Sequence, residues 1–178
     1  MVRAVRSPAR RAAGWRCGLP FLLCIGLQSG CLAADHLAAP LVGSWRLISY
    51  TDTIAGDAPT RSFGVDPVGL FIFTSDGHVS ISIMRNPPDI SAPTTDPDPD
   101  ACIPVWFCAY FGTYDVDYHA GTWVTHVRGG NVPAYLGTDQ RRHFSIRGDR
   151  LVISESYETH GKAVYAERVL VRESGERH

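Results

Sequence analysis

This sequence has almost equal numbers of positively and negatively charged residues. Lys and Arg together number 17 and Asp and Glu number 18, which gives a formal net charge of −1. A protein that binds nucleic acid through a strongly basic surface carries a positive excess, so we expect no nucleic-acid partner. Hydrophobic residues make up 44% of the chain and charged residues 20%. These proportions exclude a long disordered chain and a polytopic membrane protein.

Long apolar runs are also absent. The apolar stretch at residues 17–27 would span about 16 Å as a helix at ~1.5 Å per residue, which is too short for a bilayer core of ~30 Å. We therefore expect no membrane span. This stretch follows a basic segment, since five Arg and no Asp or Glu occur before Ala34. Small residues follow it.

This order of charge, short apolar stretch and small residues is typical of a secretory signal peptide. We predict that residues 1–34 are a cleaved signal and that residues 35–178 form one domain, in the periplasm or secreted. Ser29-Gly30-Cys31 offers an alternative, because small residues precede the modified cysteine of bacterial lipoproteins, although Gln28 replaces the expected apolar residue. The protein would then be lipid-anchored in the cell envelope through Cys31. An uncleaved anchor or an internal helix is the remaining alternative.

Cysteine is scarce outside the predicted signal. Of the five cysteines, only Cys102 and Cys108 lie beyond residue 34. Two nearby thiols in an oxidising compartment tend to pair, and closing so short a loop stabilises by roughly 2 kcal/mol in the chain-entropy model. We predict a disulfide, with free thiols as the alternative. A zinc site is disfavoured because no second Cys/His pair lies nearby.

The rest of the chain lacks the long apolar stripe of an amphipathic helix and has short alternating runs instead. These runs are rich in β-branched and aromatic residues, and turn pairs such as Asp76-Gly77 and Gly148-Asp149 separate them. The predicted strands are 43–52, 67–74, 78–85, 109–117, 121–128, 140–147, 150–157 and 163–172. Eight hairpin-linked strands predict an all-β fold, an eight-stranded antiparallel up-and-down β-barrel. A two-sheet sandwich is the alternative.

Several motifs occur in a characteristic order along these strands. They are LVGSWRL at 41–47, DPVGLFIFT at 66–74, YFGTYDV at 110–116, GTDQRRHF at 137–144, GDRL at 148–151 and ERV at 167–169. Together they resemble the bacterial and fungal lipocalin-like domain family of the wider calycin group, over about residues 40–172. The resemblance implies a small β-barrel around a hydrophobic cavity and no settled activity. Ala134-Tyr135 stands where many relatives have Asn-Trp, and a proline-rich segment at 102–108 replaces a helical one.

The resemblance and strand alternation together indicate which side chains face the interior of the barrel. The resemblance implies that Trp45 packs under an Arg of the last strand, for which Arg168 is the matching residue, in a structural cation–π pair. Alternation places Arg142 and Glu167 inside as a charge pair, together with Tyr165; a solvated pair at the rim of the barrel is the alternative. The same alternation turns Arg168 outward unless a bulge intervenes. The expected apolar cavity walls are Leu47, Phe71, Phe73, Tyr114, Trp123, Tyr135 and Phe144.

His126 and Asp115 are the candidates for catalysis, since a His near neutral pH can transfer protons. A His hydrogen-bonded on a half-buried strand face is the competing interpretation. No metal-ligand spacing, phosphate loop or dinucleotide motif is present, so we expect no metal and no cofactor.

The favoured function is binding of a small hydrophobic or amphipathic molecule in the barrel cavity. An isomerase or cyclase acting on a lipophilic substrate in the same cavity is the first alternative, and a structural interaction module of the envelope is the second. We favour a binding protein over an enzyme, and we expect a monomer or a weak dimer.

Overall fold

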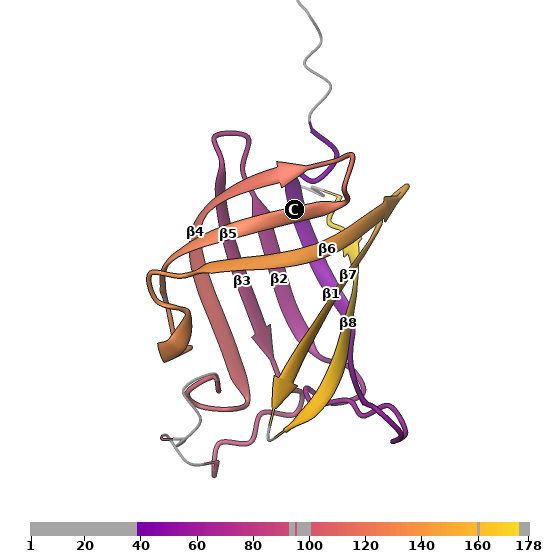
Figure 1. Ribbon diagram of the computed structural model, residues 1–178, viewed down its shortest axis with the longest axis vertical. Coiled ribbons are helices and arrows are strands. Elements are labelled where there is room, and N and C mark those ends of the chain that lie inside the picture. The colour runs from indigo at the N-terminus through magenta and orange to yellow at the C-terminus, as the bar shows by residue number, and fades with distance from the viewer. Residues whose placement is uncertain (1–38, 93–94, 96–100, 160, 175–178) are drawn as a thin grey trace, which may run out of the picture. The chain divides into compact units, whose positions relative to one another are not determined.

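Eight antiparallel strands close into a barrel in the computed structural model, which describes residues 39–92, 95, 101–159 and 161–174. The strands are connected in sequence order, and β8 pairs with β1 to complete the barrel (Figure 1). The predicted all-β up-and-down barrel is therefore confirmed. The predicted signal at 1–34, including Cys31, lies outside the described residues. The elements are β1 (Gly43–Ile54), β2 (Val68–Phe73), β3 (His78–Met84), β4 (Phe107–Asp117), β5 (Thr122–Gly130), the 3₁₀ turn η1 (Pro133–Tyr135), β6 (Asp139–Arg147), β7 (Arg150–Thr159) and β8 (Lys162–Arg172).

One irregularity in β1 determines what the barrel interior contains. The pairing of β1 with β8 shifts register between Leu47 and Ser49, as it does at a β-bulge. Trp45 and Leu47 are buried before the shift, and Tyr50 and Asp52 are buried after it. The bulge thus moves the inward face from odd-numbered to even-numbered positions, and it brings a phenol and a carboxyl inside.

Trp45 and Arg172 close one end of the barrel. These two residues are directly paired across β1 and β8, and the guanidinium carbon of Arg172 lies 4.1 Å from the centroid of the Trp45 ring. Arg172 also donates hydrogen bonds to the carbonyls of Val42 (2.8 Å) and Pro40 (2.6 Å). The Trp45 indole donates to the Leu41 carbonyl at 2.8 Å. The segment before β1 is thereby fixed across this end.

The expected pairing of Trp45 with Arg168 is wrong, because Arg172 occupies that position. Arg168 is paired with Tyr50 instead, four residues further along β8 toward the other end. Both arginines have the same parity on β8 and both face inward, so strand alternation alone does not distinguish them.

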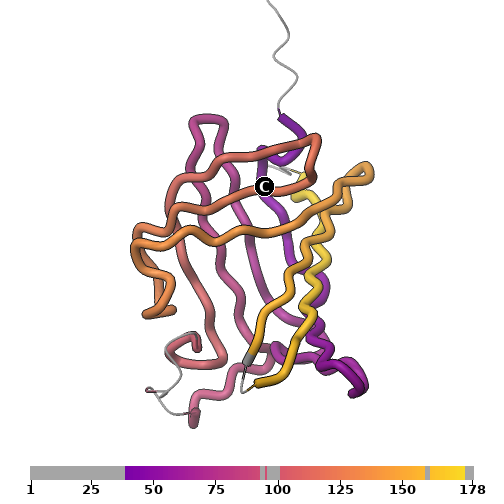
Figure 2. Tube along the Cα trace, in the orientation of Figure 1, coloured from indigo at the N-terminus to yellow at the C-terminus, as the bar shows by residue number. Residues whose placement is uncertain are grey.

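The opposite end is built from longer connections. The β1–β2 and β3–β4 connections and the β7–β8 hairpin lie together there (Figures 1 and 2). The β1–β2 connection folds back because Asp52 and Thr60 exchange backbone hydrogen bonds of 2.9 and 2.8 Å. This contact brings Phe63 into the interior and places the Ser62 hydroxyl against the Asp52 carboxylate. None of the described residues forms a helix long and apolar enough to cross a membrane.

The end closed by Arg172 gives the first prediction. Arg172→Ala removes two hydrogen bonds from a cation and its contact with the Trp45 ring, so we expect the free energy of unfolding to fall by roughly 2 kcal/mol. Urea unfolding followed by tryptophan fluorescence measures this. Arg147→Ala, at an exposed position at the end of β6, is the matched control and should change stability by less than about 0.5 kcal/mol. Equal effects of the two substitutions would contradict the assignment.

Candidate functional site

A cavity of about 1030 Å³ occupies the end of the barrel opposite Arg172. This volume lies at the upper end of the range for small-molecule sites, about 300–1,000 Å³. The apolar part of its wall comes from strands on several sides of the barrel and from the connections at its rim. The buried apolar residues of the wall are Phe63, Phe71, Ile81, Ile83, Trp123, Val132 and Ile153.

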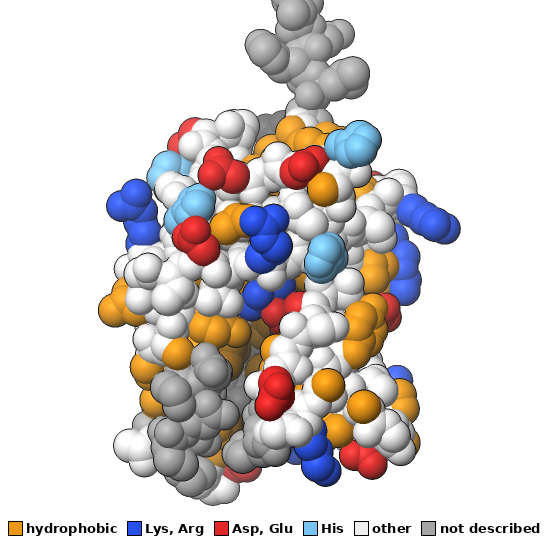
Figure 3. Space-filling view, in the orientation of Figure 1, with side chains coloured by type: hydrophobic (Ala, Val, Ile, Leu, Met, Phe, Trp, Pro, Cys, Tyr) orange, Lys and Arg blue, Asp and Glu red, His pale blue; other side chains and the backbone are white. Residues whose placement is uncertain are grey.

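The cavity reaches the surface between β6 and β7. Backbone pairing of these strands extends only from Arg147↔Arg150 to His143↔Ser154, and beyond it the two strands separate. Residues 140–143 of β6 and 154–158 of β7 line the cavity on either side of the gap. Figure 3 shows a hollow on this face with basic and acidic side chains inside it.

The rim beside β4 is held by the predicted disulfide. Cys102 and Cys108 are bonded, as predicted, and both line the cavity. The side chain of Asn131 fixes the same loop, since its Oδ1 accepts from the Ala109 amide at 2.7 Å and its Nδ2 donates to the Ile103 and Phe107 carbonyls at 3.1 and 2.6 Å. Nothing in the sequence pattern singled out Asn131.

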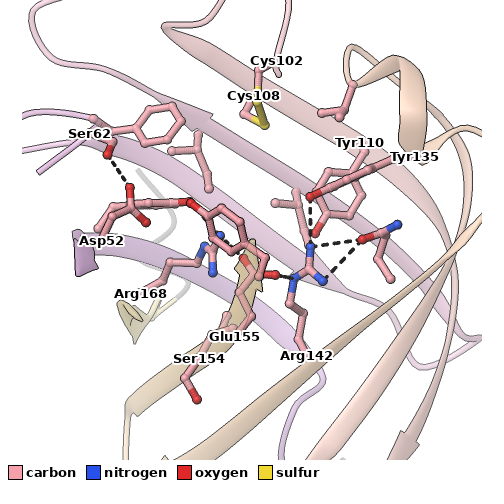
Figure 4. A pocket seen from close by; sticks show the side chains of 18 of the residues that line it. Asp52, Ser62, Cys102, Cys108, Tyr110, Tyr135, Arg142, Ser154, Glu155 and Arg168 are labelled. Atoms are coloured by element: carbon pink, nitrogen blue, oxygen red, sulfur yellow. Dashed lines mark hydrogen bonds and ion pairs between the residues drawn. A yellow bond between two sulfur atoms is a disulfide. The ribbon is translucent and has the colours of Figure 1, made fainter. Parts of the chain in front are cut away.

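A buried ion cluster lies where β6 and β7 separate (Figure 4). One carboxylate oxygen of Glu155 forms an ion pair with the Nε of Arg142, at a distance of 2.7 Å, and the other oxygen forms an ion pair with the Nη2 of Arg168. The three side chains are each about nine-tenths buried, with 9–11% of their surface exposed. Burying charge is costly unless each group is paired, and here one carboxylate neutralises part of two guanidinium charges. The Arg142–Glu155 pair also joins β6 to β7 just past their last backbone pair.

Each guanidinium has further partners among aromatic and amide groups. Arg142 donates to the Arg141 carbonyl at 2.8 Å and, at 3.4 Å, to the Gln140 amide oxygen and the Tyr135 hydroxyl. Arg168 donates to the Tyr50 hydroxyl at 2.7 Å, and its guanidinium carbon lies 4.4 Å from the centroid of that ring. Burial raises the pKa of the Tyr50 hydroxyl well above its ordinary value, so this phenol stays protonated.

Asp52 supplies the second carboxyl of the cavity. It is 8% exposed, and the Ser62 hydroxyl donates a hydrogen bond to its Oδ2. Burial raises the pKa of this carboxyl above its ordinary value, while the Ser62 hydrogen bond and the charge of Arg168 oppose that rise. A hydrogen bond from the Tyr157 hydroxyl opposes the same rise, and Nη1 of Arg168 has no hydrogen-bond partner among the described residues.

Half of the residues expected in the cavity wall lie there. Phe71, Trp123, Tyr135, Arg142 and Tyr165 line the cavity, the last at its rim with 47% of its surface exposed. Leu47 and Phe73 are buried in the core away from it. Tyr114 and Phe144 pack against that core from half-buried positions, with the Phe73 ring 5.3 Å from that of Tyr114.

The expected Arg142–Glu167 pair is wrong, because Glu155 takes the place of Glu167. On β8 the inward residues are Val164, Ala166, Arg168 and Leu170, so Glu167 points away from the cavity. The sequence reads V-L-V at 169–171, and apolar residues on both faces give no clear alternation. The signal for Glu155 was present, since Leu151, Ile153 and Glu155 alternate along β7.

His126 and Asp115, the catalytic candidates, lie outside the cavity. The His126 ring is on the outer face of β5, between Asp115 of β4 and Asp139 of β6. Its Nε2 lies 2.9 Å from Asp115 Oδ2 and its Nδ1 lies 2.7 Å from Asp139 Oδ1. With 41% of the side chain exposed, this is a surface cluster that ties three neighbouring strands.

Comparison with models of protein families identifies the domain. A family model described as a lipocalin-like domain matches residues 42–172, a range that contains all eight strands. The comparison with curated proteins finds no match. The resemblance drawn from the sequence motifs is therefore confirmed.

The surface cluster of His126, Asp115 and Asp139 predicts how the charge of His126 depends on pH. Hydrogen bonds that the His126 ring donates to the carboxylates of Asp115 and Asp139 raise the pKa of His126 above its ordinary value near 6.5. A raised pKa in the folded state means that the charged His126 stabilises the fold below pH ~6.5 and that this contribution is lost as the pH rises through the folded pKa. An NMR titration of the ring should therefore give a pKa above 6.5, and the double variant Asp115→Asn/Asp139→Asn should lower it. A native pKa at or below 6.5 would refute the arrangement.

Proposed function

Because this chain belongs to the lipocalin-like domain family, we propose that it binds a small amphipathic molecule inside its barrel. The observation that carries the proposal is the cavity of about 1030 Å³, whose wall combines buried apolar side chains, a buried cluster of charges and phenols, and polar residues at its opening. Binding sites for small molecules combine apolar walls with a few convergent polar groups that orient the ligand. A barrel packed solid with side chains would have no room for a ligand.

The polar and apolar parts of the wall define how the ligand would lie. Ile81, Ile83 and Phe71 come from neighbouring strands β2 and β3, whereas Glu155 and Arg168 come from β7 and β8. An apolar body would therefore rest against β2 and β3, with its polar end toward β7 and β8. The gap between β6 and β7 offers an entry route.

An isomerase or cyclase acting on a lipophilic substrate is the second candidate function. The observation in its favour is Asp52, a buried carboxyl in the cavity wall whose pKa burial raises. Such a group can exchange a proton with a bound substrate. Asp52 replaces His126 as the candidate for proton transfer, because His126 faces outward.

Filling the cavity tests the binding function. Ile83 lies opposite Cys108 on the paired strand β4, near the rim, so Ile83→Trp should occupy cavity volume. We expect the affinity for the fluorescent probe anilinonaphthalene sulfonate to fall at least ~10-fold, equivalent to about 1.4 kcal/mol, and any ligand retained by protein from its natural host to disappear from native mass spectra. Ser80→Trp, at an exposed position of the same strand, is the control.

Equal probe binding by the two tryptophan variants would refute binding in the cavity. A retained molecule that is converted to an isomer during incubation with the wild-type protein would favour the enzyme.

We also propose that the protein is exported, as a periplasmic or secreted monomer or weak dimer. The basic, apolar and small-residue order at 1–34 and the Cys102–Cys108 disulfide support this. Intact-mass measurement of protein from its host should place the N-terminus at Ala34 or Asp35. Palmitate incorporation that is lost on Cys31→Ser would instead establish a lipid anchor. A mature chain that still begins at Met1 would contradict both.

A further inference from the structure

Three hydrogen-bond donors at one end of the buried ion cluster have no close acceptor among the described residues. They are Nη2 of Arg142 and the hydroxyls of Tyr135 and Tyr110, and all three residues line the cavity. Figure 4 shows them together, at the opposite end of the cluster from Asp52. The ring centroids of the two tyrosines lie 5.6 Å apart, so one bound group can contact more than one of these donors.

The hydrogen bonds of Arg142 Nη2 are long. This nitrogen lies 3.4 Å from the Tyr135 hydroxyl and 3.4 Å from the Gln140 amide oxygen, whereas an N–H donor and its oxygen acceptor are normally separated by about 2.7–3.2 Å. The Nε of the same guanidinium, by contrast, lies 2.7 Å from Glu155. An incoming acceptor would therefore displace no strong hydrogen bond of Nη2.

The phenolic protons at this end are available as well. A guanidinium only donates hydrogen bonds, so Tyr135 offers an oxygen lone pair to Arg142 and keeps its own proton for another acceptor. The Tyr110 hydroxyl has no hydrogen-bond partner among the described residues. Unlike Nη1 of Arg168, it is not enclosed by them, so it is open to the cavity that Tyr110 lines. Both protons can therefore be donated to a bound molecule.

The charges near Tyr110 favour an anion. Burial raises the pKa of this phenol above its ordinary value, so the phenol stays protonated. The charges of Arg142 and Arg168 oppose that rise, and together they outweigh the charge of Glu155, which adds to it. The electrostatic potential at this hydroxyl is therefore positive. Asp52, the other buried carboxyl of the cavity, lies at the far end of the cluster (Figure 4).

We propose that the ligand carries a carboxylate, which accepts hydrogen bonds from the hydroxyls of Tyr110 and Tyr135 and from Nη2 of Arg142. This inference rests on the proposed binding function and specifies the chemical class of the ligand, an amphipathic carboxylic acid. The two oxygens of a carboxylate accept from several donors at once, and hydrogen bonds to a charged acceptor are stronger than those between neutral groups. The carboxylate lies beside the Arg142–Glu155 pair, and the apolar part of the ligand extends along the wall formed by β2 and β3.

Two probes with the same apolar chain test this proposal on the full chain. Octanoate carries a carboxylate, and its methyl ester, methyl octanoate, carries the same two oxygens without the charge. Affinities are measured by displacement of anilinonaphthalene sulfonate at pH 7.5. We expect octanoate to bind at least ~10-fold more tightly than methyl octanoate, because only the anion gains from the positive potential and from charge-assisted hydrogen bonds.

Removing the hydroxyls one at a time locates the carboxylate. Tyr110→Phe and Tyr135→Phe should each lower the affinity for octanoate at least ~5-fold and change that for methyl octanoate less than ~2-fold, since each removes one donor and keeps the ring in the wall. Tyr165→Phe is the matched control, because it also loses a phenol that lines the cavity, but at the exposed rim on β8. It should retain both affinities of the wild-type protein. The comparison of the two probes on wild-type protein remains decisive if a variant does not fold.

The remaining outcomes overturn the proposal in distinguishable ways. Equal affinity of the wild-type protein for the two probes, or preference for the ester, would reject a carboxylate site, and the proposed binding function would stand. A preference for octanoate that all three variants retain would place the carboxylate elsewhere, against the exposed Arg141 or His143 that also line the cavity. Equal loss of both probes in Tyr110→Phe and Tyr135→Phe would mean that the phenols only maintain the wall. Failure of every ligand, anilinonaphthalene sulfonate included, would reject the binding function itself.

Discussion

The ion pair between Arg142 and Glu155 is the contact on which the open end of this barrel depends. Backbone hydrogen bonds between β6 and β7 stop at His143 and Ser154, and the next inward side chains form the pair at 2.7 Å. Side chains therefore continue the connection where the backbone ladder ends. Because Glu155 also binds Arg168, the same carboxylate positions the charged wall of the cavity. The opening and the chemistry of the wall thus depend on one residue.

The two ends of the barrel differ in structure: one is closed by packed side chains, and the other is open with a fixed rim. At one end Arg172 lies over Trp45 and its hydrogen bonds to backbone carbonyls hold the preceding segment in place, so that end is packed and closed. At the other end the disulfide and Asn131 fix the rim without filling the interior. A rigid rim around an unfilled interior leaves the cavity preformed, so the proposed ligand would bind without the free-energy cost of ordering loops.

The sequence predicted the fold well and the site only in part, for reasons that individual residues make clear. Alternation of apolar residues and well-marked turns defines eight strands, because burial of one face imposes a period of two. Alternation also found Arg142 and would have found Glu155. It failed on β8, where Val169, Leu170 and Val171 are all apolar, and on β1, where a bulge shifts the register. Contacts between strands distant in sequence, such as Tyr50 with Arg168, follow from barrel closure and cannot be inferred from a local pattern.

The bulge between Leu47 and Ser49 decides which side chains of the second half of β1 face the cavity. Deleting Ile48, the residue that the register skips, would restore a regular strand and leave Tyr50 and Asp52 facing inward. A regular strand that kept Ile48 would instead turn Ser49 and Thr51 inward and expose Tyr50 and Asp52, although none of those four side chains would have changed. The presence or absence of the bulge therefore decides which side chains of the same sequence line the cavity. Comparing related barrels requires aligning the position of the bulge before comparing the amino acids that follow it.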